Sequence, residues 1–121
     1  MAVKFIVLSK GTELFHFPME KLVYIEAQGN YSEIVTLDGR RALVAMQLGQ
    51  IEDALNSQIG DDCGIIRLGR GLIINCQYVY KIDIAKQALY MSDCAGFWKE
   101  LSASRTVLMQ LKTLMERNEK D

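Results

Sequence analysis

The sequence contains few of the residues that mark metal-binding or disulfide-linked proteins. Its 121 residues include one proline, one histidine and three cysteines. The cysteines, Cys63, Cys76 and Cys94, form no Cys-x-x-Cys pair, and His16 alone offers little help in completing a metal site. We therefore expect reduced, mostly structural thiols, with no bound metal or cofactor.

The chain also lacks a long apolar segment. Near the N-terminus the apolar run covers only Phe5 to Leu8, which is too short for a secretory signal or a membrane-spanning helix. The formal net charge is −1 at pH 7, so any anion-binding surface must be local. These features predict a cytoplasmic protein with one domain over residues 1–121.

No catalytic set is visible in the sequence. His16 lies between two phenylalanines in a strand-like segment, where a solvent-facing side chain is the favoured interpretation. Ser102 and Ser104 have no His or Asp partner nearby in the sequence. The Gly69-Arg70-Gly71 segment is followed by strand-like residues and not by the Lys-Ser/Thr of a phosphate loop. We therefore expect a protein without enzymatic activity.

Most of the chain reads as short strands separated by turn residues. Lys10-Gly11 separates two β-type segments, and Asp38-Gly39 predicts a tight primed turn whose central residues take positive φ angles. Segments 63–85 and 88–104 are again rich in β-branched and aromatic residues, with a turn near residues 92–96. This pattern predicts a mainly β protein built from antiparallel strands.

Two segments have helical spacing instead. Leu48, Ile51 and Leu55 recur along Gln47 to Gln58, which predicts a short internal helix. A second helix is expected near the C-terminus, with Ser104 as its N-cap. Its apolar stripe consists of Val107, Leu108, Leu111, Leu114 and Met115. The folded core is expected to span about residues 4–115, with residues 116–121 as a frayed tail.

Three polar segments lie beside the expected strands. The first contains Asn30, Tyr31 and Ser32, the second Arg67 and Arg70, and the third Ser104 and Arg105. Each also has a purely structural interpretation: a polar turn, a salt-bridged kink and a helix cap. Together, however, they are polar or basic loops on a β scaffold, which is where recognition residues usually occur.

The order of these segments resembles the LytTR-type DNA-binding domain of bacterial transcription regulators. The matching segments are LVYIEAQGNYSEIVTLDGR, QLGQIEDAL, IIRLGRGLIINCQYVYKID and LSASRTVLMQLKTLM. They follow the order of the family's I-x-Y-I-E-A-x-x-x-Y hairpin, internal helix, F-x-R-I-H-R-S-Y-I-V-N-x-x-Y-I segment and closing V-S-R helix. The resemblance runs from about Lys4 to Met115.

This resemblance implies a fold of stacked small antiparallel β-sheets with one short internal helix and a C-terminal helix. It also implies sequence-specific binding of double-stranded DNA, with loops that read successive major grooves. The first loop would use Ser32, flanked by Asn30 and Tyr31. The second would use Arg70, with Gly69 and Gly71 beside it, and the third Arg105, supported by Ser104. Arginine suits this role because its guanidinium can bond both O6 and N7 of guanine.

The chain departs from the family pattern at the second loop. Gly69 and Gly71 stand where the family often has His and Ser, so two side chains that would contact DNA or support the arginine are absent. Glu33 places a negative charge beside the first loop, which would repel phosphate or accept a hydrogen bond from cytosine. Arg67 matches the family pattern, and for it a structural ion pair and a DNA contact are equally expected.

Several partners are compatible with this sequence. We expect double-stranded DNA with repeated half-sites, since a single module makes few phosphate contacts. Useful affinity would then need two copies of the chain, as in a homodimer. Regulation would come from binding a separate regulatory protein, unless the sequence is a fragment of a larger regulator. The alternative is a LytTR-like domain that has lost DNA binding and serves in protein interaction or dimerisation, which Phe97 and Trp98 would favour.

Overall fold

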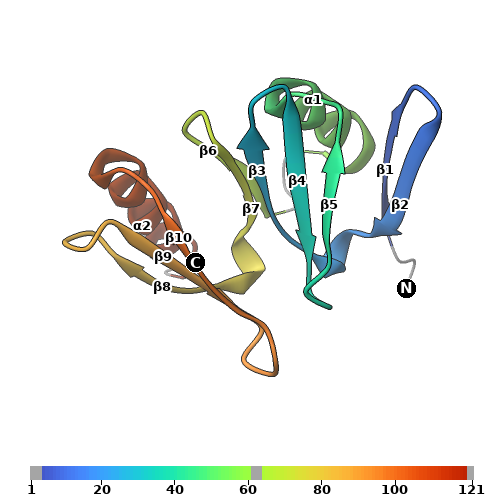
Figure 1. The fold of residues 1–121 in the computed structure, drawn as a ribbon. Coiled ribbons are helices and arrows are strands. Elements are labelled where there is room, and N and C mark those ends of the chain that lie inside the picture. Colours follow the sequence, from blue (N-terminus) through green and yellow to red (C-terminus); the bar gives the residue numbers. More distant parts are fainter. Residues whose placement is uncertain (1–3, 61–63, 120–121) are drawn as a thin grey trace. The chain divides into compact units, whose positions relative to one another are not determined.

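A computed structural model describes residues 4–60 and 64–119, with side chains up to residue 117. The chain divides into two compact units, residues 1–77 and 78–121 (Figure 1). The first unit holds a five-stranded sheet, a two-stranded hairpin and a helix, and the second holds a three-stranded sheet and a helix. The expected mainly β fold of small antiparallel sheets with one internal and one C-terminal helix is confirmed.

The first unit begins with a hairpin of β1 (Phe5–Lys10) and β2 (Glu13–Pro18), followed by a 3-10 turn at Met19–Lys21. The five-stranded sheet that follows has the order β5-β4-β3-β7-β6, with every neighbouring pair antiparallel. Its strands are β3 (Leu22–Gln28), β4 (Tyr31–Thr36), β5 (Arg41–Val44), β6 (Ile65–Leu68) and β7 (Leu72–Asn75).

The core of the first unit lies between one face of this sheet and helix α1 (Leu48–Ile59). Ile25 pairs with Ile34 on one side and with Ile73 on the other, so the three side chains share a face. They join one buried cluster with the buried face of α1, formed by Leu48, Ile51, Leu55 and Ile59. The helical spacing in the sequence therefore identified the packing face of α1.

Helix α1 is held at both ends by glutamine side chains. At its start, Gln47 and Gln50 form a reciprocal capping box, and the Gln47 N–H donates to Gln50 Oε1 at 2.9 Å. Near its end, Gln58 Oε1 accepts from the Val7 N–H at 2.8 Å, and Gln58 Nε2 donates to the Val7 carbonyl at 2.7 Å. The predicted helix over Gln47 to Gln58 is thus confirmed with a shift of one residue.

The connection between β4 and β5 differs from the tight primed turn that we expected. Strand β4 ends at Thr36 and β5 begins at Arg41, and only Gly39 of the Asp38-Gly39 pair has a positive φ, 82°. The Asp38 carboxylate accepts hydrogen bonds from the Thr36 hydroxyl and the Arg40 N–H. These two bonds lower the pKa of Asp38 and stabilise a wider turn, so the prediction of positive φ at both residues was wrong.

The second unit is a three-stranded antiparallel sheet with a helix. Its strands are β8 (Val79–Asp83), β9 (Ala88–Ser92) and β10 (Trp98–Ser102), in the order β10-β9-β8. A 3-10 turn at Cys76–Tyr78 precedes β8. Helix α2 (Arg105–Glu119) contacts β8 and buries Leu108 and Leu111. The predicted apolar stripe of this helix therefore faces the core.

The connection between β9 and β10 is organised by one carboxylate. Asp93 Oδ1 accepts hydrogen bonds from the backbone N–H groups of Ala95, Gly96 and Phe97, at 2.9 to 3.0 Å. These bonds lower the pKa of Asp93, with the Phe97 N–H as the largest contributor. The turn predicted near residues 92–96 is confirmed, and it extends to Phe97.

The last described segment of the chain is helical. Helix α2 continues to Glu119, four residues beyond the expected limit of the core at Met115. Residues 120–121 lie outside the part of the chain that the structure describes. Among the described residues, neither helix is long and apolar enough to cross a membrane.

Candidate nucleic-acid interface

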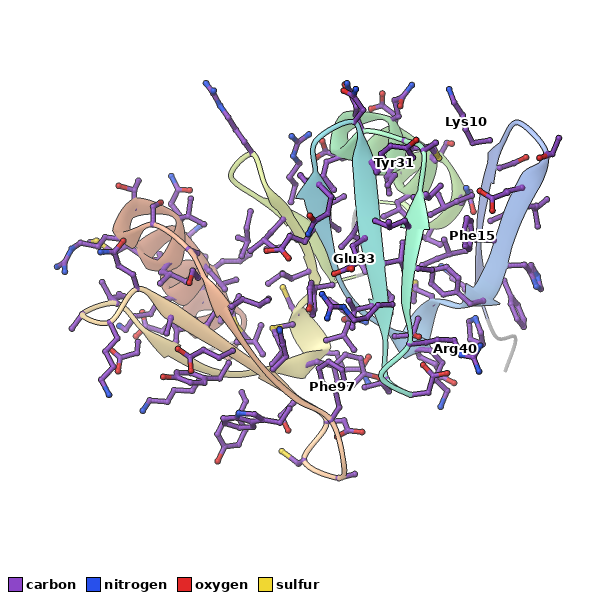
Figure 2. The ribbon with its side chains drawn as sticks, in the orientation of Figure 1. Lys10, Phe15, Tyr31, Glu33, Arg40 and Phe97 are labelled. Atoms are coloured by element: carbon purple, nitrogen blue, oxygen red, sulfur yellow. The ribbon has the colours of Figure 1, made fainter. Side chains whose placement is uncertain are left out.

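The first candidate segment is a two-residue turn between β3 and β4. Gln28 pairs with Tyr31 across the strands, which leaves Gly29 and Asn30 as the turn. Gly29 takes a positive φ of 65°, a conformation that glycine adopts without steric cost. Asn30 is exposed, and 51% of the Tyr31 surface is exposed at the start of β4 (Figure 2). Both side chains are therefore accessible to a ligand.

Ser32 does not share this exposure. It is 0% exposed, and its hydroxyl donates a hydrogen bond of 2.7 Å to the Met46 carbonyl. Because Ser32 is buried on β4, its hydroxyl is used to hold the segment that leads into α1. Direct contact of Ser32 with DNA stays a prediction.

The second candidate segment is the turn that joins β6 and β7. Leu68 pairs with Leu72, so Gly69, Arg70 and Gly71 form the turn. Gly69 has a positive φ of 60°, and all three turn residues are exposed. The side chain of Arg70 makes no ion pair with any residue in the described part of the chain. The sequence-based expectation of a strand, a glycine-flanked turn and a second strand is confirmed.

Arg67 supports this turn from within the protein. Its Nη1 lies 3.1 Å from Glu52 Oε1 on α1, and its Nε and Nη2 donate to the carbonyls of Gly69 and Arg70 at 3.2 and 3.4 Å. The guanidinium is thus committed to α1 and to the backbone of the turn. The structure shows the structural role that was expected for Arg67, and its contact with DNA stays a prediction.

The two turns lie at the same end of the five-stranded sheet (Figure 1). Glu26 on β3 pairs with Leu72 on β7, and the next link is a hydrogen bond of 2.9 Å from the Ala27 N–H to the Gly71 carbonyl. This bond joins the strand that leads into the Gly29-Asn30 turn to the last residue of the Arg70 turn. The first unit therefore presents Asn30, Tyr31 and Arg70 at one end of one rigid sheet.

Glu33 lies on β4, two positions after Tyr31, and pairs with Glu26 on β3. Its side chain is only 13% exposed, and Glu33 Oε1 lies 2.8 Å from Arg41 Nη2. The hydrogen bond to Glu33 raises the pKa of Arg41 above its ordinary value. Because the carboxylate is mostly buried and neutralised by Arg41, it repels a phosphate less than its place in the sequence suggested.

The third candidate segment lies in the second unit, at the start of α2. The Val107 N–H donates to Ser104 Oγ at 3.3 Å, and the Leu108 N–H donates to the Ser104 carbonyl at 3.0 Å. Ser104 is therefore the N-cap of α2, as its position in the sequence predicted. Arg105 is the first helical residue and is exposed, and the first turn of α2 contains no acidic residue. This helix end carries a positive potential that suits an anion.

The structure also bears on the cysteines and on metal binding. Neither Cys76 nor Cys94 forms a disulfide within the described residues, and Cys63 lies outside them. Residues 4–60 and 64–119 contain no group of three or more His, Cys, Asp or Glu side chains that could hold a metal ion. Two structural partners were not predicted from the sequence, namely Glu52 for Arg67 and Met46 for Ser32. Both are far from their partners along the chain, so no local pattern could reveal them.

Comparison with known proteins agrees with this architecture. The LytTr DNA-binding domain of a protein described as a methyl-accepting/DNA response regulator from Bacillus cereus has a similar fold, with a TM-score of 0.62 and 16% sequence identity. The similarity covers 94% of this chain and 98% of that structure. No curated protein sequence matches this chain. The profile of the LytTr DNA-binding domain matches residues 12–116. Because residues 12–116 are 105 of the 121 residues, the match covers most of the chain, and the chain belongs to the LytTR family of DNA-binding domains.

Proposed function

We propose that this chain binds double-stranded DNA at specific sequences, through loops that enter the major groove, and acts in bacterial transcription regulation in the cytoplasm. Membership of a family of DNA-binding domains supports this proposal in general terms. The observation that supports sequence-specific binding is the exposure of Arg70. Its exposed guanidinium extends from a turn that Arg67 fixes to α1 and that β3 supports through Ala27.

Arg70 has the chemistry required of a base-reading residue. A guanidinium can donate two hydrogen bonds to O6 and N7 of guanine, and no ion pair within the described residues competes for it. Asn30 and Tyr31 extend from the neighbouring turn and can hydrogen-bond to phosphate and sugar. We assign base reading to Arg70 and backbone contacts to Asn30, Tyr31, Gly69 and Gly71. The two glycines offer backbone N–H groups in place of side chains.

The start of α2 supplies a second set of contacts in this proposal. Arg105 would contact a base, while the N–H groups of the first turn, with Ser104 as cap, would hold a phosphate. The two compact units would thus serve as one DNA-binding domain over residues 1–121. Since each copy makes few contacts, we propose binding to repeated half-sites by two copies of the chain, or together with a separate regulatory protein.

Selection from a random duplex library tests this proposal. We expect enrichment of one sequence motif that contains guanine, and an affinity for the selected duplex that falls as salt concentration rises. Recovery of no motif, together with binding that does not respond to salt, would contradict the proposal. That outcome would favour the alternative of a LytTR-like module for protein interaction or dimerisation.

A further inference from the structure

The second unit carries a cluster of aromatic rings on the outside of its sheet. The rings of Tyr80 and Trp98 meet edge to face with centroids 5.3 Å apart, and the rings of Tyr90 and Trp98 have centroids 5.6 Å apart. Trp98 is 58% exposed and Tyr80 is 57% exposed. We call this surface, formed by Tyr80, Tyr90 and Trp98, the aromatic face.

The aromatic face lies on the side of the sheet opposite the core of the second unit. Leu89 and Met91 on β9 are fully buried, and Tyr90 between them points the other way because side chains alternate along a strand. The aromatic rings therefore contribute little to the core of this unit. Contiguous exposed aromatic surface of this kind usually marks an interface, since tyrosine and tryptophan are enriched in protein contacts.

Two opposite charges flank the aromatic face in one row across the sheet. Tyr90 on β9 pairs with Lys81 on β8 and with Glu100 on β10, so the row reads Lys81, Tyr90, Glu100. Lys81 Nζ lies 5.6 Å from the centroid of the Tyr90 ring. Both charged side chains are exposed, and neither forms a salt bridge with any other described residue. The row is therefore a cation and an anion on either side of an aromatic ring.

We propose that the aromatic face is the surface through which two copies of this chain pair. A two-fold axis that lies in the interface above Tyr90, parallel to the strands, would place Lys81 of each copy against Glu100 of the other, with the rings in the centre. An isologous interface requires such self-complementary charge, and an aromatic centre with charged residues at the rim is the usual arrangement of an interface. This pairing requires no DNA. It goes beyond the proposed function because it assigns the surface through which two copies of the chain meet.

A nucleic acid is a less suitable occupant of the same surface. Aromatic rings can stack on bases, but such platforms lie in positively charged grooves that follow the phosphate backbone. Here Glu100 stands in the row with Tyr90 and offsets the charge of Lys81. A neutral row with separated charges fits a second copy that presents the same charges in reverse order.

The first experiment uses Trp98, which is the only tryptophan in the chain. Sedimentation of the DNA-free chain over a concentration series should show a monomer–dimer equilibrium, and tryptophan emission should shift to shorter wavelength in parallel as the ring becomes buried. A chain that stays monomeric throughout would overturn the proposal. So would a dimer in which the emission of Trp98 does not change, because the copies would then pair through another surface.

The second experiment reverses the charges. Lys81→Glu and Glu100→Lys should each weaken dimerisation by about tenfold, because each places like charges opposite one another. The double variant restores opposite charges and should dimerise as the unchanged chain does. Lys86→Glu, in the turn between β8 and β9, is the matched control and should have little effect. Failure of the double variant to recover would overturn the pairing of Lys81 with Glu100. Because no DNA is present, this result is independent of the DNA-binding proposal.

Discussion

At the scale of single residues, the structure divides the polar side chains into those that hold the fold and those that remain available. Ser32 and Arg67 bond to backbone carbonyls within the first unit, whereas Arg70 and Asn30 extend from turns. Arg67 holds the turn that carries Arg70, and Ser32 holds the segment that leads into α1. Substitutions at the two kinds of residue should therefore have different consequences.

Ser32→Ala should reduce stability without changing which DNA sequence is preferred. The substitution removes the donor to the Met46 carbonyl and leaves that buried acceptor without its partner, at a cost of about 1–3 kcal/mol. Urea denaturation measures the free energy of unfolding, and selection from random duplexes measures the preference. Unchanged stability with an altered motif would show that Ser32 contacts DNA after all.

The two glycines beside Arg70 should respond differently to alanine. Gly69 has a φ of 60°, so Gly69→Ala should lower the free energy of unfolding by about 1–2 kcal/mol. Gly71 does not have a positive φ, and a Cβ there would meet no atom within 4 Å. We expect Gly71→Ala to change stability by no more than about 0.5 kcal/mol in urea denaturation. Equal losses in both variants would contradict the backbone conformation of this turn.

At the scale of elements, periodicity and turn residues predicted much of what the structure contains. The spacing of Leu48, Ile51 and Leu55 gave α1 within one residue, and Ser104 gave the start of α2. Local sequence patterns did not predict the role of a side chain where that role depends on a partner far away along the chain. The burial of Ser32 depends on Met46, and the role of Arg67 depends on Glu52, fifteen positions away. The turn at Asp38 was missed because a side-chain carboxylate, and not backbone preference, sets its width.

The turn between β9 and β10 should contribute stability that depends on pH. Its N–H groups lower the pKa of Asp93 below its ordinary value of 3.8, so the ionised carboxylate stabilises the folded chain. This contribution is complete above pH 3.8 and is lost as the pH falls through the lower pKa of the folded state.

Asp93→Asn tests this dependence because asparagine has no titrating group. Urea denaturation at a series of pH values should show that the unchanged chain loses more stability on acidification than the variant does. Parallel losses in the two proteins would mean that the hydrogen bonds to Asp93 do not favour its ionised form.

At the scale of the whole molecule, each of the two compact units carries its own set of proposed DNA contacts. The first provides the turns with Arg70 and Asn30, and the second provides the capped start of α2 with Arg105. The resemblance in the sequence predicted the family and the fold. The accessibility of the expected contact residues depends on burial and on hydrogen bonds between distant residues. These could be seen only in the structure.

The most direct test of base reading by Arg70 compares the variants Arg70→Ala and Arg40→Ala. The affinity of each variant is measured for the selected duplex and for a scrambled one. Arg40 is an exposed arginine at the opposite end of the five-stranded sheet, so its substitution controls for the loss of one positive charge (Figure 2). Titration of each duplex by fluorescence anisotropy at fixed salt gives the four affinities. We predict that Arg70→Ala weakens binding to the selected duplex by about 1–3 kcal/mol and brings it close to binding of the scrambled duplex, while Arg40→Ala changes neither by a comparable amount. Equal losses on both duplexes, or no loss on either, would contradict the assignment of base reading to Arg70.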